Sequence, residues 1–260
     1  MEHIELANKL LQRRTPIVLV KWIISFLSDR TQTVTINEAR SKLYSVTSGV
    51  PQGSVLGPLL FILYTDDIDQ VIDKNVTIRK YADDIKLYCM YEASEATAGY
   101  AALQRSLDNV AQWSLKNYLP LNIRKCCSMH FGSKSPAMSF SIGPVNLSIS
   151  NCERDLGVQI DNKLSFKQHI HNVTSKARRA VGQILRLFIS RNANVLMPVF
   201  NAFVRPILEY ASPVWSPALE KYNRSIESVQ RRFTKRICGL RDVSYEQRIR
   251  RLGTCALNVN

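Results

Sequence analysis

Two neighbouring carboxylates, Asp83 and Asp84, stand between apolar and β-branched stretches in the run Tyr81-Ala-Asp-Asp. Adjacent carboxylates repel each other, and their burial without a partner is costly. At the tip of a hairpin a divalent cation would offset this charge, because Mg²⁺ prefers carboxylate oxygens and keeps coordination positions for substrate phosphates. Two such ions can activate an attacking 3′-hydroxyl and stabilise a leaving pyrophosphate. The alternative is a solvated turn, which the pair alone does not exclude.

The chain contains a second adjacent pair, Asp66-Asp67, which provides a comparison. This pair follows an apolar helical stretch and is joined by Asp69 and Asp73. Acidic residues directly after a helix are usually hydrated, so we expect a solvated helix exit here. Asp83-Asp84 differs because apolar residues typical of strands flank it on both sides.

A glycine-rich segment at residues 49–58 is the second candidate for chemistry. Gly49 and Gly53 allow close backbone approach, and Gln52 offers both a donor and an acceptor to a base or sugar edge. A helix that starts near Val55 would direct its free amide groups toward this loop, which suits a phosphate. A plain turn before a helix is the alternative interpretation.

The elements that must position these residues follow from hydrophobic periodicity. An N-terminal helical pattern is interrupted at Pro16 and resumes, and a hairpin with a loop at residues 38–41 follows. An apolar helix then leads to a strand-turn-strand unit around Asp83-Asp84 and to an amphipathic helix that ends before Pro120. The expected ranges are strands 31–37 and 43–47, helix 55–68, strands 76–81 and 85–90, and helix 94–118. The buried stripe of that last helix is expected at Leu103, Leu107, Val110 and Ala111.

The second half begins with short strands and then turns helical. Strands are expected at 128–131, 138–142, 145–149 and 156–160, and apolar residues stepping by three and four predict helices over 170–187 and 219–233. A helix near 195–210 carries Pro198 and Pro206, so it should be broken or kinked. We therefore predict an α+β fold, with an α+β region over residues 1–160 and a basic helical region over residues 161–260.

Charge is distributed unevenly along the 260 residues, which have the apolar and charged content of a globular protein of one or two domains. The chain holds 35 basic and 21 acidic residues, a net charge of +14. Residues 1–150 contribute a net +3, whereas residues 151–260 contribute +11. This surplus favours a polyanionic partner, either nucleic acid or an anionic membrane surface; a solubilising surface is the alternative.

Cysteine spacing and hydropathy narrow the class of protein further. The six cysteines show no CxxC pairing, so reduced thiols in an intracellular protein are expected and a zinc site is not. The acidic N-terminus lacks the apolar run of a secretory signal. The longest apolar stretch, residues 55–64, is well short of the ~20 residues that span a bilayer, so no membrane partner is expected.

Taken in order, the two motifs carry a resemblance. Ser48-Gly-Val-Pro-Gln-Gly-Ser-Val-Leu-Gly-Pro-Leu-Leu-Phe61, followed about twenty residues later by Tyr81-Ala-Asp-Asp84, resembles the reverse transcriptases of non-LTR retrotransposons, with the jockey-like elements nearest. The resemblance covers essentially the whole chain. It continues through Leu121-Asn-Ile-Arg-Lys125, Met129-His-Phe, Asp155-Leu-Gly-Val-Gln-Ile-Asp161, Leu164-Ser-Phe166 and Arg205-Pro-Ile-Leu-Glu-Tyr-Ala-Ser-Pro-Val-Trp215.

The resemblance implies an RNA-directed DNA polymerase that performs template-directed nucleotidyl transfer by a two-metal mechanism. It implies a partial right-hand palm over residues 1–160, then a basic helical thumb and the start of the following region over residues 161–260. The implied cofactor is Mg²⁺ or Mn²⁺. The implied partners are an RNA template, a DNA primer and deoxynucleoside triphosphates, and the implied location is the nucleus.

The resemblance also assigns roles to individual residues. Asp83 and Asp84 match the catalytic, metal-binding pair, and Lys125 lies where the family carries a lysine near the incoming triphosphate. Leu156 and Gly157 match the hairpin that grips the primer. The nucleotide pocket would include Gly49, Pro51, Gln52 and Gly53. Nucleic-acid contacts are expected from Lys176, Arg178, Arg179, Arg186, Arg231, Arg232, Lys235 and Arg236.

One departure from the family pattern affects the expected activity. The family carries another catalytic aspartate on a palm strand, upstream of the point near His3 where the match begins. We therefore expect a chain truncated at both ends that does not polymerise by itself. An active polymerase, a catalytically dead nucleic-acid-binding remnant and a fragment without function of its own all stay open.

Overall fold

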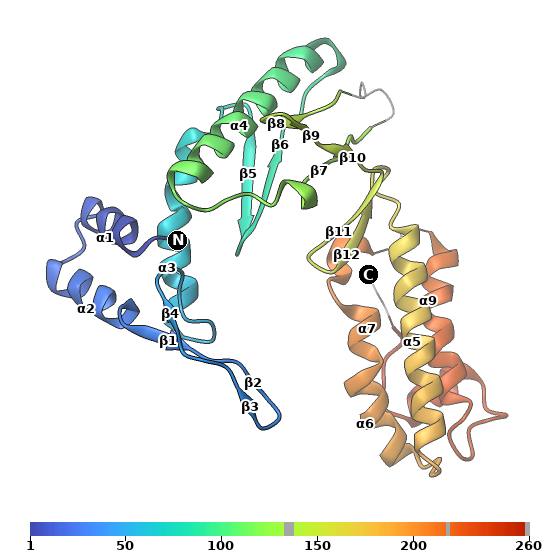
Figure 1. The fold of residues 1–260 in the computed structure, drawn as a ribbon. Coiled ribbons are helices and arrows are strands. Elements are labelled where there is room, and N and C mark those ends of the chain that lie inside the picture. Colours follow the sequence, from blue (N-terminus) through green and yellow to red (C-terminus); the bar gives the residue numbers. More distant parts are fainter. Residues whose placement is uncertain (133–137, 217–218, 258–260) are drawn as a thin grey trace. The chain divides into compact units, whose positions relative to one another are not determined.

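The protein folds into two compact units of mixed helix and small two-stranded sheets, which confirms the predicted α+β class (Figure 1). The computed structural model describes residues 1–132, 138–216 and 219–257. The first unit comprises Met1–Ser128 and Ser133–Ile149, and the second comprises Met129–Gly132 and Ser150–Asn260. Within the described ranges, no helix combines the length and apolar character needed to cross a bilayer.

The first unit opens with a helical hairpin, as the N-terminal periodicity predicts. Helices α1 (His3–Gln12) and α2 (Ile17–Leu27) are separated at Pro16, which cannot donate a backbone hydrogen bond and begins α2. Both helices pack on α3 (Leu56–Thr65) through an apolar cluster. The cluster contains Leu6, Leu10, Val20, Ile23, Leu27, Leu60 and Tyr64.

A β-hairpin follows α2, but its turn is tighter than expected. Strand β1 (Arg30–Gln32) pairs with β4 (Tyr44–Val46), and β2 (Thr35–Ile36) pairs with β3 (Ala39–Arg40). The predicted loop over 38–41 is therefore wrong, because Ala39 and Arg40 form strand β3 and the turn lies at residues 37–38. Asn37 adopts a left-handed backbone with φ of 53°. Asparagine tolerates this conformation, which lets the chain reverse direction at once.

The predicted strand-turn-strand unit is confirmed. Helix α3 continues into the 3₁₀-helix η1 (Asp66–Val71), and strand β5 (Thr77–Tyr81) then pairs antiparallel with β6 (Asp84–Tyr88). Tyr81 lies opposite Asp84 as the last pair of the ladder. The turn therefore consists of Ala82 and Asp83.

Helix α4 (Ala96–Lys116) follows the short 3₁₀-helix η2 (Ala93–Glu95) and packs on two sides. Val110 and Trp113 pack with Ile68 against the β5–β6 hairpin, whereas Leu103 and Leu107 pack against Phe140 and its neighbours. The predicted stripe is thus divided between two clusters. The unit is completed by η3 (Ile123–Lys125), β7 (Cys127–Ser128), β8 (Ser141–Ile142), β9 (Val145–Asn146) and β10 (Ser148–Ile149). Strand β10 pairs parallel with β7, and β8 pairs antiparallel with β9.

The second unit contains a β-hairpin, although the sequence pattern predicts only one of its two strands. Strand β11 (Cys152–Asp155) pairs with β12 (Val158–Asp161), and the strand expected over 156–160 begins two residues too early. Leu156 and Gly157, with φ values of 43° and 87°, form the turn between the strands. Two-residue hairpin turns with positive φ at both positions match the natural twist of the flanking strands.

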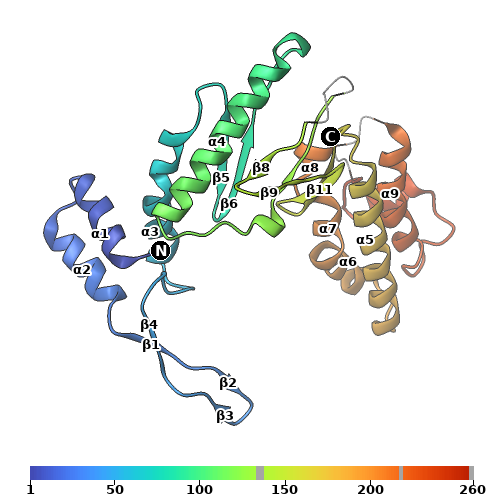
Figure 2. The same cartoon turned by 45° about the horizontal axis from the view of Figure 1, so that its top comes forward.

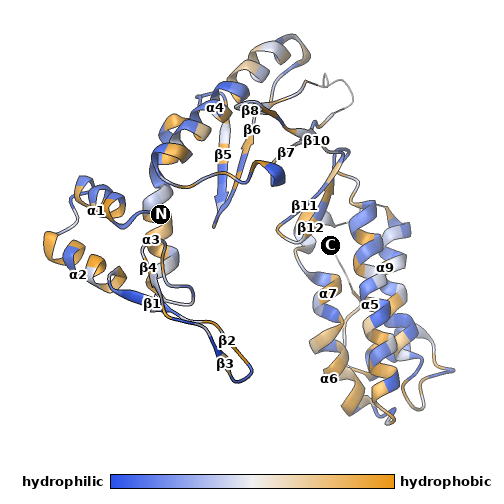
Figure 3. Ribbon diagram, viewed as in Figure 1, coloured by the Kyte–Doolittle hydropathy of each residue, from blue (hydrophilic) through white to orange (hydrophobic). Residues whose placement is uncertain are grey.

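A helical core completes the second unit. It contains α5 (Lys167–Leu187), α6 (Ala193–Phe203), α7 (Arg205–Glu209), α8 (Ser212–Trp215), α9 (Glu220–Thr234) and α10 (Tyr245–Arg251). The predicted break is confirmed, because α6 ends at Phe203 and α7 restarts with Pro206 in its first turn. Phe200, Phe233 and Trp215 are fully buried between these helices. Figure 3 shows many hydrophilic residues on α5 and α9 and a largely hydrophobic α6.

Candidate functional site

Asp83 and Asp84 lie at the exposed tip of the β5–β6 hairpin. Ala82 begins the turn with a left-handed φ of 51°, so Asp83 occupies the turn and Asp84 is the first residue of β6. Within the described part of the chain, neither carboxylate has a hydrogen-bond or ion-pair partner. The flanking strands are only partly buried, so the tip is open to water and to ligands.

These carboxylates suit a hard cation, but they do not form a protein cage for one. Across residues 1–132, 138–216 and 219–257, no group of three His, Cys, Asp or Glu side chains is placed to hold a metal ion. Mg²⁺ is often held by one or two carboxylates, with waters and substrate phosphates completing its octahedral shell. The donor set at the tip therefore fits a cation that is shared with a phosphate ligand.

The glycine-rich loop precedes α3, as predicted, and its two glycines are required by backbone conformation. Gly49 and Gly53 have φ values of 85° and 80°, and a Cβ atom at either position would meet nothing within 4 Å. No side chain or backbone segment among the described residues therefore approaches the backbone closely at either glycine. The space beside both glycines is open. The turn of the β5–β6 hairpin and this loop lie toward the same side of the first unit (Figures 1 and 2).

Both ends of this loop are fixed. The Gly49 amide donates to the Met1 carbonyl at 2.8 Å, and the Gly49 carbonyl lies 2.9 Å from His3 Nε2. At the other end, Ser54 Oγ donates to the Pro51 carbonyl at 2.7 Å and accepts from the Gly57 amide at 3.0 Å. The serine thus satisfies one of the free amides at the start of α3 and rigidifies the loop.

Pro51 is half-buried in this loop, whereas Gln52 and Gly53 are exposed. Lys125 is exposed as well, at the end of η3 and directly before Cys126 and β7. The loop, Asp83-Asp84 and Lys125 all belong to the first unit. Among the described residues, no hydrogen bond or ion pair joins the three groups, and the Gln52 and Lys125 side chains are available to a ligand.

The acidic residues after α3 form an ion-pair network, so the expectation of a solvated helix exit holds only in part: the Asp66 and Asp69 side chains are 51% and 52% exposed, whereas Asp67 is held by the buried Lys9. Lys9 Nζ lies 2.7 and 2.9 Å from the two Asp67 carboxylate oxygens, and Trp113 Nε1 donates to the same carboxylate at 3.2 Å. The other acidic residues each have a basic partner: Asp66 pairs with Arg13, Asp69 with Lys80, and Asp73 with Arg105. The basic partners lie on α1 and its C-terminal end, on β5 and on α4, which short-range sequence spacing cannot reveal.

The pKa values of this network follow from its hydrogen bonds. The hydrogen bond from Arg13 lowers the pKa of Asp66 below its usual value, and that from Arg105 lowers the pKa of Asp73. Both carboxylates are therefore ionised near neutral pH. In contrast to Asp83 and Asp84, they are neutralised by the protein itself, which explains why they do not need a cation.

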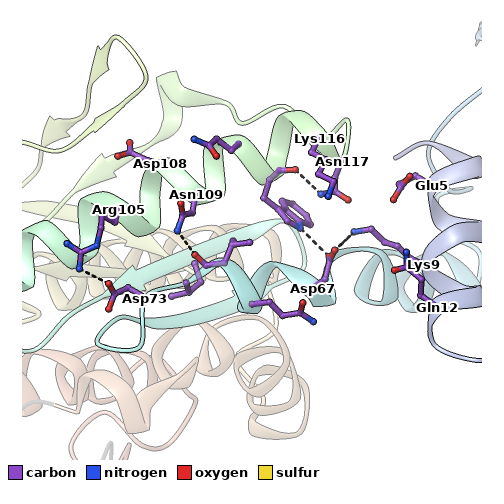
Figure 4. A pocket seen from close by; sticks show the side chains of 15 residues that line it. Glu5, Lys9, Gln12, Asp67, Asp73, Arg105, Asp108, Asn109, Lys116 and Asn117 are labelled. Atoms are coloured by element: carbon purple, nitrogen blue, oxygen red, sulfur yellow. Dashed lines mark hydrogen bonds and ion pairs between the residues drawn. The ribbon is translucent and has the colours of Figure 1, made fainter.

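The network borders a pocket of about 780 Å³ between α1, η1 and α4 (Figure 4). Lys9 lies at one end, where its ammonium group also faces the rings of Tyr64 and Trp113 at 4.7 and 5.1 Å from their centroids. Arg105 and Asp73 lie at the other end (Figure 4). The sequence pattern gives no indication of this pocket, because its lining residues come from three separate segments.

In the second unit, Leu156 and Gly157 form the exposed turn between β11 and β12. Tyr210, from the segment after α7, donates its hydroxyl to the Leu156 carbonyl at 2.9 Å. Tyr210 lies within the motif Arg205–Trp215, whose sequence indicates no role for it. No local pattern could have found this contact, because 54 residues separate Tyr210 from Leu156.

The predicted basic residues are exposed on two helices that pack against each other, α5 and α9, and directly after α9. Those of α5 are Lys176, Arg178, Arg179 and Arg186, and those of the later set are Arg231, Arg232, Lys235 and Arg236. Arg178 donates to Ser228 Oγ at 3.2 Å, which links the two helices. In the part of the chain that the structure describes, none of these cations forms an ion pair with a carboxylate.

Cysteine chemistry contributes little to the site. All six cysteines are free thiols. Burial raises the pKa of the Cys89 and Cys126 thiols above their usual value, so both are protonated near neutral pH.

Comparison with known proteins shows a family match over most of the chain. Residues 1–180 match the family described as reverse transcriptase (RNA-dependent DNA polymerase). The matched range contains the loop before α3, the Asp83-Asp84 turn, Lys125 and the Leu156-Gly157 turn. It ends within α5.

Individual relatives come from mobile elements of insects. The chain is 27% identical to the RNA-directed DNA polymerase from mobile element jockey of Drosophila melanogaster, over 95% of this chain and 29% of that protein. It is 29% identical to the jockey polymerase of Drosophila funebris, over 90% of this chain and 27% of that protein. It is 26% identical to the probable RNA-directed DNA polymerase from transposon X-element of Drosophila melanogaster, over 83% of this chain and 24% of that protein. The chain thus spans less than a third of the length of these relatives.

Proposed function

This chain belongs to the reverse transcriptase (RNA-dependent DNA polymerase) family, and we propose that it contributes the catalytic carboxylate pair to RNA-templated DNA synthesis by a non-LTR retrotransposon. The observation that carries the proposal is the contrast between the two aspartate pairs. Asp66 and Asp67 are neutralised by Arg13 and Lys9, whereas the exposed Asp83 and Asp84 have no partner among the described residues.

The reaction joins a primer 3′-hydroxyl to the α-phosphorus of a deoxynucleoside triphosphate. The new P–O bond forms as the bond to the leaving pyrophosphate breaks, and the hydroxyl proton passes to solvent. Mg²⁺ or Mn²⁺, when bound, lowers the pKa of the attacking hydroxyl and offsets charge on the leaving oxygens. In this chain Asp83 and Asp84 would hold such a cation at the β5–β6 turn.

The remaining residues of the first unit position the nucleotide. The open backbone beside Gly49 and Gly53 admits a base or sugar, and Pro51 fixes the loop through its carbonyl contact with Ser54. Gln52 offers an amide to the base or sugar edge, and Lys125 supplies a positive charge for the triphosphate. Such positioning is the main source of rate enhancement in phosphoryl and nucleotidyl transfer.

We assign residues 1–160 to a partial palm and residues 161–260 to a basic thumb with the start of the following region. The compact units divide close to this boundary, between Ile149 and Ser150, and the β11–β12 hairpin belongs to the second unit. The exposed cations of α5 and α9 support the thumb assignment, because neutralising phosphates is the main source of affinity for nucleic acid. Their partner in this proposal is an RNA template paired with a DNA primer, in the nucleus.

A two-metal centre needs a metal ligand in addition to Asp83 and Asp84. The family pattern carries a further catalytic aspartate on a palm strand ahead of His3, and a two-metal centre needs ligands that fix both ions about 4 Å apart. We therefore expect residues 1–260 alone not to extend a primer. Supplying the upstream segment of a jockey relative should restore extension.

Primer extension on an RNA template tests this proposal. The proteins are residues 1–260, the fusion with the upstream segment, and the fusion carrying either Asp83→Asn or Asp66→Asn. The expected result is extension by the fusion, a loss of about 100-fold or more with Asp83→Asn, and nearly full activity with Asp66→Asn, because Asp66 serves only an ion pair. Full activity of the Asp83→Asn fusion would show that the metal-binding pair is misplaced.

A second candidate function is that of a catalytically dead nucleic-acid-binding remnant. The observation that favours it is the set of exposed cations on α5 and α9 that form no ion pair with a carboxylate of the described residues, because these cations can bind nucleic acid without any chemistry at Asp83. A fusion that binds an RNA–DNA duplex but does not extend its primer would select this second function.

A further inference from the structure

The turn at Leu156-Gly157 is held from outside its own hairpin by a single aromatic residue. Tyr210 donates its hydroxyl to the Leu156 carbonyl at 2.9 Å, across the top of the turn. Its ring lies beside Gly157, where an added Cβ atom would come within 3.0 Å of the Tyr210 Cε1 atom. Two features therefore favour glycine at this position: its φ of 87°, which other residues rarely adopt, and the tyrosine ring, which leaves little room for a Cβ atom.

Tyr210 is itself fixed by the buried core of the second unit. Its amide donates to the Pro206 carbonyl at 3.1 Å, and its carbonyl accepts from Trp215 Nε1 at 2.8 Å. Trp215 is fully buried, and the left-handed Ala211, with φ of 54°, lets the chain reverse between the two aromatic residues. The Tyr210 backbone is thus fixed by hydrogen bonds to the core, although the Tyr210 side chain is largely exposed.

The same tryptophan also contacts His169, which binds the strand that follows the turn. The edge of the His169 ring packs on Trp215, with 5.0 Å between the ring centroids, and His169 Nδ1 accepts from the Gln159 amide of β12 at 3.2 Å. The β11–β12 hairpin is therefore tied to Trp215 at two points, through Tyr210 at Leu156 of the turn and through His169 at Gln159 of β12. Two ties of this kind fix the direction of the hairpin relative to the helical core of its own unit.

We propose that Tyr210 is a positioning residue that holds the Leu156-Gly157 turn against the backbone of the bound nucleic acid. The proposal rests on the proposed function, in which this turn contacts the primer. The Leu156 side chain is exposed, and Gly157 presents bare backbone, so the turn can approach a sugar-phosphate strand closely. The Tyr210 hydroxyl orders the turn before nucleic acid binds, which lowers the entropic cost of binding.

The test compares Tyr210→Phe with Tyr222→Phe in the full chain. Tyr210→Phe keeps the ring beside Gly157 and removes only the hydroxyl. Tyr222 lies in α9 of the same unit, and its hydroxyl makes no hydrogen bond to any described residue, so Tyr222→Phe is the matched control. The first readout is the ¹⁵N relaxation order parameter of the Leu156 and Gly157 amides, and the second is affinity for an RNA–DNA duplex at fixed salt. A third variant, Leu156→Ala, tests directly whether the turn contacts nucleic acid.

The proposal predicts that Tyr210→Phe lowers both order parameters from the rigid range near 0.85 toward about 0.6 and weakens duplex affinity about 3- to 10-fold. Tyr222→Phe should change neither, and Leu156→Ala should weaken affinity without loosening the turn. Unchanged order parameters in Tyr210→Phe would overturn the positioning role. A loosened turn with unchanged affinity in both Tyr210→Phe and Leu156→Ala would instead overturn the contact between turn and nucleic acid.

Discussion

The ammonium group of Lys9 and the carboxylate of Asp67 lie 2.7 Å apart, although 58 residues separate them along the chain. The Lys9 side chain is only 7% exposed, and its Nζ atom also donates to the Tyr64 carbonyl at 2.8 Å. Because Trp113 of α4 donates to the same carboxylate, this pair joins three elements of the first unit: α1, η1 and α4. These elements support both the loop before α3 and the β5–β6 hairpin.

Replacing Lys9 with Met should destabilise the protein by about 2–4 kcal/mol. Methionine keeps the apolar part of the side chain but removes the ammonium group. The partly buried Asp67 carboxylate then loses its ion-pair partner, and the Tyr64 carbonyl loses its hydrogen-bond donor. Urea unfolding, monitored by the fluorescence of Trp113 and the other tryptophans, measures this loss.

Arg13→Met provides the control for Lys9→Met. Arg13 pairs with Asp66 at the surface of the same region, where both side chains are more than a third exposed. Such surface pairs contribute less than about 1 kcal/mol. Equal losses for the two variants would contradict a special structural role of the Lys9–Asp67 pair.

Acid should destabilise the second unit through His169. Burial, together with the nearby Arg154 charge, lowers the pKa of this imidazole below its usual value of 6.5. The folded state therefore holds His169 neutral, and the unfolded state binds a proton first as the pH falls. Stability from this group is fully present above pH 6.5 and decreases below it, with a slope of at most about 1.4 kcal/mol per pH unit.

Thermal unfolding of His169→Gln from pH 7.5 to 5 tests this pH dependence. Glutamine keeps an acceptor for the Gln159 amide but does not titrate, so the variant should lose less stability than the wild type between pH 6.5 and 5. His171→Gln, at an exposed position of the same helix, should keep the wild-type profile. Parallel profiles for the wild type and His169→Gln would exclude His169 as the source.

Binding of an RNA–DNA duplex should depend strongly on salt and little on sequence. If the exposed cations of α5 and α9 neutralise about four to six phosphates, log K falls with log salt at a slope of roughly −3 to −5. Arg179→Gln should reduce the magnitude of this slope by about 1. Arg224→Gln should leave it unchanged, because Arg224 is already paired with Glu220 at 2.6 Å. A salt-independent affinity would contradict the electrostatic account.

Sequence periodicity predicts those elements whose contacts are local or whose apolar faces are uniform. Ile85, Leu87 and Cys89 alternate with polar or aromatic residues after Asp83-Asp84, and Pro16 and Pro206 remove backbone donors, so the β5–β6 hairpin and both helix breaks could be predicted. Strand β11 could not, since its residues Cys152–Asp155 are mostly polar and half-exposed. Leu187 continues the apolar spacing of α5, yet it is 78% exposed, although its neighbours Leu185 and Phe188 pack against the core.

Some features of the candidate site could likewise be predicted from the sequence, and others could not. Glycines at positive φ and a carboxylate pair between strands are visible in the sequence, because their chemistry depends on neighbours in the chain. The neutralisation of Asp66 and Asp67, and the tie from Tyr210 to Leu156, depend on partners more than 50 residues away. Such contacts are set by the tertiary fold, which no local pattern specifies.

Titration with Mn²⁺, followed by water-proton paramagnetic relaxation, tests most directly the claim that Asp83 and Asp84 are the metal-binding pair. Weak binding by the wild-type chain is expected, because no third His, Cys, Asp or Glu among the described residues is placed to complete the site with this pair, and a clear loss is expected in Asp83→Ala/Asp84→Ala. The matched variant Asp66→Ala should bind Mn²⁺ as the wild type does, since Asp66 is already paired with Arg13. Equal Mn²⁺ affinity in the wild type and the Asp83→Ala/Asp84→Ala variant would contradict the account.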